Sequence, residues 1–209
     1  MTHREAAQTN NTKLIRRMTA LLLCFLMLMA AAGCAHKSGA VVKVEKELDA
    51  LKSSESVGSE VDSLRTALSD EGKGNFDSFL KKLRDFNYEV TGDKASDKPD
   101  EDTVTVTVRI KTYDFGREYL ATWTDYLKEN NDALSGDDLD GFYETLFARL
   151  AALDKKECIK YVDITCIEPL ENGEWIANIK NNKQLQDAIF GGMLSEMNAL
   201  ADADDGEVD

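Results

Sequence analysis

Cys34 is the residue whose surroundings point most directly to chemistry. It ends an uncharged apolar stretch, residues 20–34, and the three residues before it, Ala31-Ala32-Gly33, have small side chains. A basic segment, an apolar run of about a dozen residues and small residues at its end are the layout of an export signal. We therefore expect residues 1–33 to be removed, which leaves Cys34 as the new N-terminus. The basic residues of this signal are Lys13, Arg16 and Arg17.

The run Ala31-Ala32-Gly33-Cys34 resembles the lipobox of bacterial lipoproteins. In that family a diacylglyceryl group is attached to the cysteine sulfur before the signal is cleaved. The resemblance implies that Cys34 is lipidated and that acyl chains such as palmitate hold the protein on the extracytoplasmic face of the cell membrane. Each buried methylene of such a chain contributes about 0.8 kcal/mol to anchoring. Ala31 departs from the leucine that is commoner at that position, and a secreted protein with an unlipidated Cys34 is the alternative.

The charge of the chain limits its partners. The formal net charge is −14, and residues 1–33 hold four basic side chains and one acidic one, so the remainder carries 21 basic and 38 acidic side chains, net −17. Nucleic-acid binding needs a basic face, and adsorption on an anionic bilayer needs basic residues too. We expect the membrane as a partner only through lipid on Cys34, no nucleic acid, and an unidentified small molecule or protein as a further partner.

Histidine and metal chemistry have little support. After the signal the chain has one histidine, His36, so most histidine-based catalysis and most zinc sites are excluded. The run Gly136–Gly141 is rich in aspartate, but Gly136 and Phe147 occupy positions where a calcium loop requires acidic ligands. Its acids are read as helix-start charges. We expect no metal and no cofactor.

Cys158 and Cys166 lie eight residues apart in a segment that has the composition of one strand. A strand rises about 3.3 Å per residue, which puts the two thiols beyond the reach of a disulfide. We expect two buried free thiols. A bridge would require a chain reversal, for which Lys160–Thr165 offers no glycine or proline.

Apolar residues recur at helical spacing in several segments. Asn75 is the expected N-cap of the third, after a loop at Glu71–Gly74. Leu51 and Leu120 are expected to face inward. A glycine pair, Gly191-Gly192, falls inside the last pattern and indicates a close approach of that helix to the sheet; a phosphate cradle is the alternative, but the pair lacks the residues that such a loop requires. The predicted helices cover residues 41–51, 57–68, 76–83, 116–130, 139–153 and 185–193.

Four segments have the alternation of a strand. In the clearest, residues 103–111, valines and an isoleucine face one way and threonines the other. Loops at Gly92–Asp102 and Leu170–Gly173 are expected to join the strands into two antiparallel hairpins. The predicted strands are residues 86–90, 103–111, 157–168 and 174–180.

The order of these elements predicts an α+β fold. We expect a curved antiparallel sheet of about four strands, formed by two hairpins, packed against helices on one face. About 175 residues after the signal are enough for one domain with its own core. The expected segments are the signal peptide 1–33, the lipidated cysteine and short tether 34–40, a single domain 41–200 and an acidic tail 201–209.

Four short motifs, taken in order, resemble those of a group of small lipoproteins from Gram-positive anaerobes. Those proteins have a curved-sheet domain akin to the nuclear-transport-factor-like and cystatin-like folds. The resemblance covers most of residues 41–200, and the element order departs from the nuclear-transport-factor-like one, in which helices precede all strands. Such domains hold binding pockets and occasionally enzymes, so the fold implies no single function. The motifs are Phe86–Gly92, Thr103–Val108, Asn172–Trp175 and Asp187–Met193.

Five residues are the candidate lining of a pocket in such a sheet. Pockets are mostly apolar with a few polar groups, and aromatic side chains suit them; the alternative is that these residues are ordinary core. Among them, Asp114 could act as an acid or base, or it could cap the helix that begins near Gly116. The candidates are Tyr88, Tyr113, Asp114, Trp123 and Trp175.

The hypothesis that fits these observations best is a lipid-anchored extracytoplasmic binding or accessory lipoprotein without catalysis. A small hydrolase or isomerase that uses a pocket carboxylate is one alternative. A structural envelope protein that self-associates, through an exposed sheet face, is the other. The absence of paired carboxylates at fixed spacing counts against the enzyme but does not separate binding from assembly.

Overall fold

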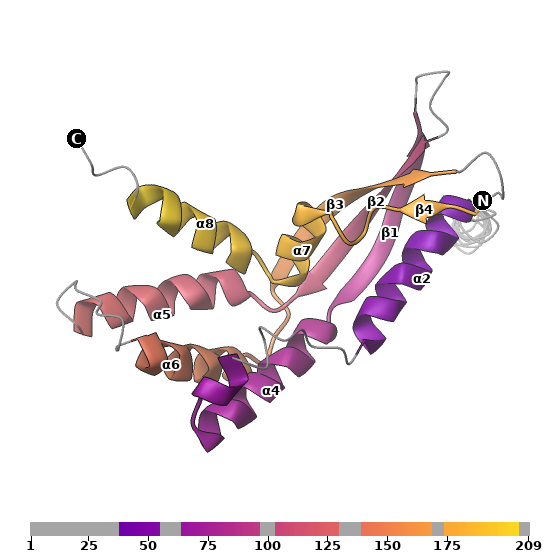
Figure 1. Ribbon diagram of the computed structural model, residues 1–209. Helices are drawn as coiled ribbons and strands as arrows, with labels where there is room; N and C mark the ends of the chain where they lie inside the picture. Colours follow the sequence, from indigo (N-terminus) through magenta and orange to yellow (C-terminus); the bar gives the residue numbers. More distant parts are fainter. Residues whose placement is uncertain (1–37, 55–63, 97–102, 130–138, 169–173, 205–209) are drawn as a thin grey trace, which may run out of the picture. The chain divides into compact units, whose positions relative to one another are not determined.

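The computed structural model describes residues 38–54, 64–96, 103–129, 139–168 and 174–204 (Figure 1). The chain divides into two units, Met1–Lys37 and Ser38–Asp209. The expected export signal, Cys34 and the turn at Leu170–Gly173 lie outside the described residues. All the architecture given below belongs to the second unit.

The described strands form one antiparallel sheet in the order β1-β2-β3-β4. The strands are β1 (Asn87–Ala95), β2 (Thr103–Thr112), β3 (Cys158–Ile167) and β4 (Ile176–Ala177). This confirms the α+β class and the sheet built from two antiparallel hairpins.

The boundaries of two strands differ from expectation. β1 continues through Gly92 to Ala95 because a bulge between Val90 and Gly92 absorbs the change of register, and β4 is only two residues long.

One face of the sheet is covered by two helices, α2 (Gly39–Ser53) and α7 (Lys183–Ile189) (Figure 1). The alternation in β2 makes this face apolar, and its side chains pack on Val44 and Leu48 of α2 and on Leu185 of α7. α2 begins within the expected tether, because Ser38 caps it and Ala40 is fully buried. Leu51, expected to face inward, is 39% exposed near the end of α2.

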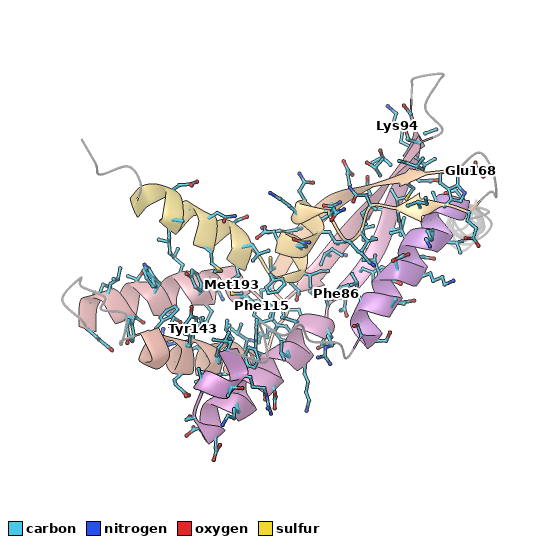
Figure 2. The ribbon with its side chains drawn as sticks, in the orientation of Figure 1. Phe86, Lys94, Phe115, Tyr143, Glu168 and Met193 are labelled. Atoms are coloured by element: carbon cyan, nitrogen blue, oxygen red, sulfur yellow. The ribbon has the colours of Figure 1, made fainter. Side chains whose placement is uncertain are left out.

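A second core lies among three further helices: α4 (Asp70–Arg84), α5 (Phe115–Glu129) and α6 (Leu139–Ala152). It is mainly aromatic. The rings of Phe76 and Phe147 meet edge to face with centroids 4.7 Å apart, a favourable geometry for aromatic pairs. Figure 2 labels Phe115, Tyr143 and Met193, which belong to this cluster or pack against it. Leu120 on α5 was predicted to face inward and is instead 37% exposed.

The predicted loop at Glu71–Gly74 and the predicted cap at Asn75 are wrong. α4 begins at Asp70, and the cap is Ser69, whose hydroxyl accepts a hydrogen bond from the Gly72 amide at 3.0 Å. The two glycines lower helix propensity, but the Ser69 cap and a tertiary contact outweigh them. Gly72 lies against the carboxylate of Glu144 on α6, where a larger side chain would collide.

The predicted single C-terminal helix is divided in two. Gly191 and Gly192 have φ values of 57° and 86°, which end α7 and separate it from α8 (Met193–Asp204). The expected close packing is present, but against the start of α5: the Gly116 amide donates a hydrogen bond of 3.1 Å to the Gly191 carbonyl. Residues 201–204, expected in the acidic tail, belong to α8, and residues 205–209 lie outside the described ranges.

Both core clusters consist of residues between Ala40 and Met193, so residues 38–209 have a hydrophobic core of their own. None of the helices in the described ranges has the length and apolar character that crossing a bilayer demands.

Candidate functional site

Of the five predicted pocket residues, four belong to the two core clusters or pack against them, and none of the five lines the pocket described below. Tyr88 and Trp175 pack against the first core, on the covered face of the sheet. Tyr113 and Trp123 belong to the second, aromatic cluster, where the Trp123 and Phe142 rings meet edge to face at 5.3 Å. The interpretation of these aromatics as ordinary core therefore fits the structure. Asp114 lies immediately before α5, between Tyr113 and Phe115 of the second cluster.

Tyr88 and Tyr113 each bury a ring and direct a hydroxyl to a carboxylate. The Tyr88 hydroxyl donates to Asp49 at 2.8 Å, and the Tyr113 hydroxyl donates to Asp85 at 3.0 Å. Burial, together with the hydrogen bond to Asp49, raises the pKa of Tyr88 to about 12. A phenol held neutral in this way stabilises the fold and is not available as a base.

A compact polar group surrounds Tyr113. Its hydroxyl partner Asp85 also forms an ion pair of 2.7 Å with Lys156, and the ammonium group of Lys82 lies 4.6 Å from the Tyr113 ring centroid. Burial alone would raise the pKa of Asp85, but the hydrogen bonds from Lys156 and Tyr113 lower it. The group connects α4, the end of β2 and the segment before β3.

Asp114 has the geometry of a helix cap. Its carboxylate accepts a hydrogen bond from the Arg117 amide at 3.2 Å and lies 3.7 Å from the Arg117 guanidinium. These contacts engage the carboxylate at the positive end of α5, as an N-cap does. In the part of the chain that the structure describes, Asp114 does not line the pocket given below, and the contacts of its carboxylate are those of a cap.

Cys158 and Cys166 are free thiols on β3. Cys166 is buried and Cys158 is half-buried, so only one of the two is as deeply placed as expected. Desolvation raises the pKa of Cys166 to about 11. Burial, and then the nearby charge of Asp114, raise the pKa of Cys158. A thiol with a raised pKa stays protonated at neutral pH and is a poor nucleophile.

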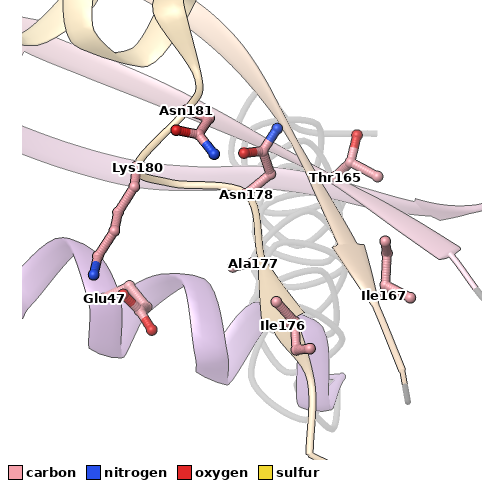
Figure 3. A pocket seen from close by; sticks show the side chains of 8 residues that line it. All are labelled: Glu47, Thr165, Ile167, Ile176, Ala177, Asn178, Lys180 and Asn181. Carbon is pink, nitrogen blue, oxygen red and sulfur yellow. The ribbon is translucent and has the colours of Figure 1, made fainter. Parts of the chain in front are cut away.

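A shallow pocket of about 660 Å³ lies between α2 and the β3–β4 edge (Figure 3). Lys180, from the segment after β4, extends toward Glu47 on α2 (Figure 3). The lining combines two isoleucines with carboxylate, ammonium, amide and hydroxyl groups, so it suits an amphipathic ligand. The lining residues are Glu47, Thr165, Ile167, Ile176, Ala177, Asn178, Lys180 and Asn181.

The face of the sheet turned away from α2 and α7, which we call the open face, carries large apolar side chains. Four of them are 45–65% exposed. This surface could have been predicted from the sequence. In β3 both the even-numbered and the odd-numbered positions include apolar residues, so one set can face the core and the other the open face. The exposed four are Ile159, Tyr161, Ile167 and Ile176.

Within the described ranges, no three histidine, cysteine, aspartate or glutamate side chains lie together as a metal site would require. Comparisons of the chain with protein-family models, with curated proteins and with solved structures found no match. The resemblance to small Gram-positive lipoproteins therefore stays a prediction from sequence.

Proposed function

We propose that the protein is a lipid-anchored extracytoplasmic lipoprotein whose folded unit binds a partner and performs no catalysis. The observation that carries the anchor is the position of Cys34, after an apolar run and three small residues. Two acyl chains are enough for durable anchoring, whereas one gives only reversible binding. The anchor would hold the unit that begins at Ser38 close to the extracytoplasmic surface.

Binding, rather than catalysis, is supported by the state of the titratable groups. Asp114 caps a helix, both tyrosine candidates donate to carboxylates, and both thiols have raised pKa values. The pocket beside β4 and the open face of the sheet are surfaces of the kind that bind partners. The pocket lining favours a small molecule that has both polar and apolar groups.

The anchor is tested by expressing the full chain in a Gram-positive host with an alkyne analogue of palmitate. We expect label on the wild-type protein and its complete loss in Cys34→Ala, with release of that variant into the medium. Cys24→Ala is the matched control, because it removes a cysteine from the same apolar run and leaves Cys34 in place. Label that persists in Cys34→Ala would refute the anchor.

The binding part is tested separately by native mass spectrometry of residues 38–209 after incubation with an extract of the producing cells. We expect a reproducible added mass below about 1 kDa, the size that such pocket volumes accommodate. Lys180→Glu should abolish it, because this change places two carboxylates in the pocket, while Lys183→Glu, just beyond the lining, should not. An added mass that both variants retain, or no added mass, would exclude this pocket as the binding site.

A further inference from the structure

The exposed apolar side chains of the structure are concentrated on the open face. Eight large apolar residues are markedly exposed in the described ranges, and four of them project from β3 and β4 on this one face. The other four are dispersed over three helices, as single surface residues usually are. They form two apolar ends, Ile159 with Tyr161 and Ile167 with Ile176, and large apolar side chains exposed on one face mark an interaction surface.

The register of the strands shows which side chains share this face. Residues directly opposite in an antiparallel pair point to the same side, so Arg109 accompanies Tyr161, Thr107 accompanies Asp163, and Ile176 accompanies Ile167. Between the two apolar ends the face carries threonines, which are uncharged and compact. These are Thr103, Thr105, Thr107 and Thr165.

The charge of the open face differs from that of the chain. It holds three basic side chains and two acidic ones, net +1, whereas the whole chain has a net charge of −14. Both acids are engaged within the face. Arg109 pairs with Glu89 at 3.1 Å, and Asp163 accepts a hydrogen bond of 2.7 Å from Thr107. A second copy of this acidic chain can therefore approach here without the repulsion that its net charge creates elsewhere.

The apolar residues of β3 are also placed symmetrically. Ile159 and Ile167 each lie four residues from Asp163, which is about 13 Å at about 3.3 Å per residue. A two-fold axis that crosses β3 near Asp163 would place Ile159 of each copy over Ile167 of the other. It would also bring the two Asp163 carboxylates near each other, each of them bound by Thr107 of its own copy. This self-complementarity is what an isologous dimer interface requires.

We propose that two copies of the chain pack face to face through their open faces, with their β3 strands antiparallel. The three long strands, of nine or ten residues each, make a surface of roughly 33 by 14 Å, on the order of 500 Å² before side-chain relief is counted. A dimer of standard size buries about 800 Å² on each partner. The face is smaller than that, so the dimer we propose is a weak and reversible one.

The inference goes beyond the proposed function and is tested without the anchor. Sedimentation velocity on residues 38–209, which contain both cores, should show a monomer–dimer equilibrium between about 1 µM and 1 mM. Tyr161→Asp and Ile167→Asp should each raise the dissociation constant at least about tenfold, because either change puts a charge into the interface. Added salt should strengthen the dimer by screening the net charge.

Val42→Asp is the matched control, since Val42 is 52% exposed on α2 and the change in charge is identical. It should leave the dissociation constant unchanged. Far-ultraviolet circular dichroism melts of each variant establish that the fold persists. A monomer throughout the range, assemblies larger than a dimer, or equal weakening by Val42→Asp would overturn the proposal. None of these outcomes depends on lipidation of Cys34. Ile167 also lines the pocket beside β4, whereas Tyr161 does not, so Tyr161→Asp is the variant that tests the dimer separately from a ligand in that pocket.

Discussion

Gly191 is the residue whose conformation is most strictly determined. Its φ of 57° lies in the left-handed region, and a Cβ there would collide with the carbonyl of Tyr113. We predict that Gly191→Ala lowers the free energy of unfolding by at least about 2 kcal/mol, from backbone strain of about 1–2 kcal/mol and the added steric clash. Urea denaturation of residues 38–209 measures this loss.

Gly74→Ala is the control for that prediction. Gly74 lies inside α4, and a Cβ there has no neighbouring atom within 4 Å. Alanine should therefore stabilise the protein by about 0.5–1 kcal/mol, the usual difference between the two residues in a helix. A Gly191→Ala variant as stable as the wild-type protein would show that the turn between α7 and α8 can relax.

The residue scale is also where sequence reasoning was weakest. The sequence indicated which aromatic residues are partly or fully buried, but it did not show that the molecule has two cores, so Tyr88 and Trp123 could not be assigned to different clusters. The cap at Asp114 was among the stated alternatives, because a carboxylate just before a helical pattern is a common start signal. The exposure of Tyr161 depends on which face of β3 the helices cover, which only the tertiary fold decides.

At the scale of elements, the start of α4 provides a direct test. Ser69 caps this helix through its hydroxyl, and Asp70 and Glu71 add favourable charges to its first turn. We predict that Ser69→Ala lowers the free energy of unfolding by about 1 kcal/mol. Asn75→Ala changes the residue that sequence alone suggested as the cap, and it should cause no loss, because Asn75 lies within α4. If Asn75→Ala were the more damaging change in urea denaturation, the helix would begin where the sequence pattern suggested.

Helices and strands whose apolar residues recur at a regular spacing were predicted well. Those that also contain glycines, or whose apolar pattern continues past their end, were not. β2 alternates polar with apolar residues from Thr103 to Lys111, so its position, its faces and its hairpin partner followed from the pattern. α4 was misjudged at its start, because Gly72 and Gly74 resemble a loop when the contact with Glu144 is unknown. β4 was predicted too long, because Ile179 continues the apolar pattern but belongs to the core rather than to the strand.

At the scale of the whole molecule, charge sets how stability depends on pH. The net charge is −14 at pH 7 and the isoelectric point is about 4.6, so repulsion among carboxylates weakens as the pH falls. Specific carboxylates act in the opposite sense. A hydrogen bond from Arg65 lowers the pKa of Asp77, and burial, which alone would raise the pKa of Asp187, is outweighed by hydrogen bonds from Lys160 and Ser195.

Charge repulsion and the contacts of particular carboxylates change stability in opposite directions as the pH falls, so stability should have a maximum at an intermediate pH. A carboxylate whose folded pKa lies below its usual value of 3.8 contributes stability that is fully present above that value and is lost as the pH falls through the folded pKa. The melting temperature should therefore rise from pH 7 to about pH 5 and fall below about pH 4. Added salt should raise it at pH 7 and have little effect near the isoelectric point, because there is then little net charge to screen.

Asp187→Asn separates the stabilising contacts of one carboxylate from the repulsion that the net charge creates. The variant should be less stable than the wild-type protein at pH 7 by about 1–2 kcal/mol, because Lys160 loses a partner at 2.6 Å. The difference should close as the pH falls through the lowered pKa of Asp187, since the wild-type carboxyl group then becomes protonated as well. Glu157→Gln, at an exposed ion pair of 3.4 Å with Arg117, should show no measurable difference at either pH. A constant difference for Asp187→Asn across the pH range would mean that shape, rather than charge, makes Asp187 important where α7 packs on the sheet.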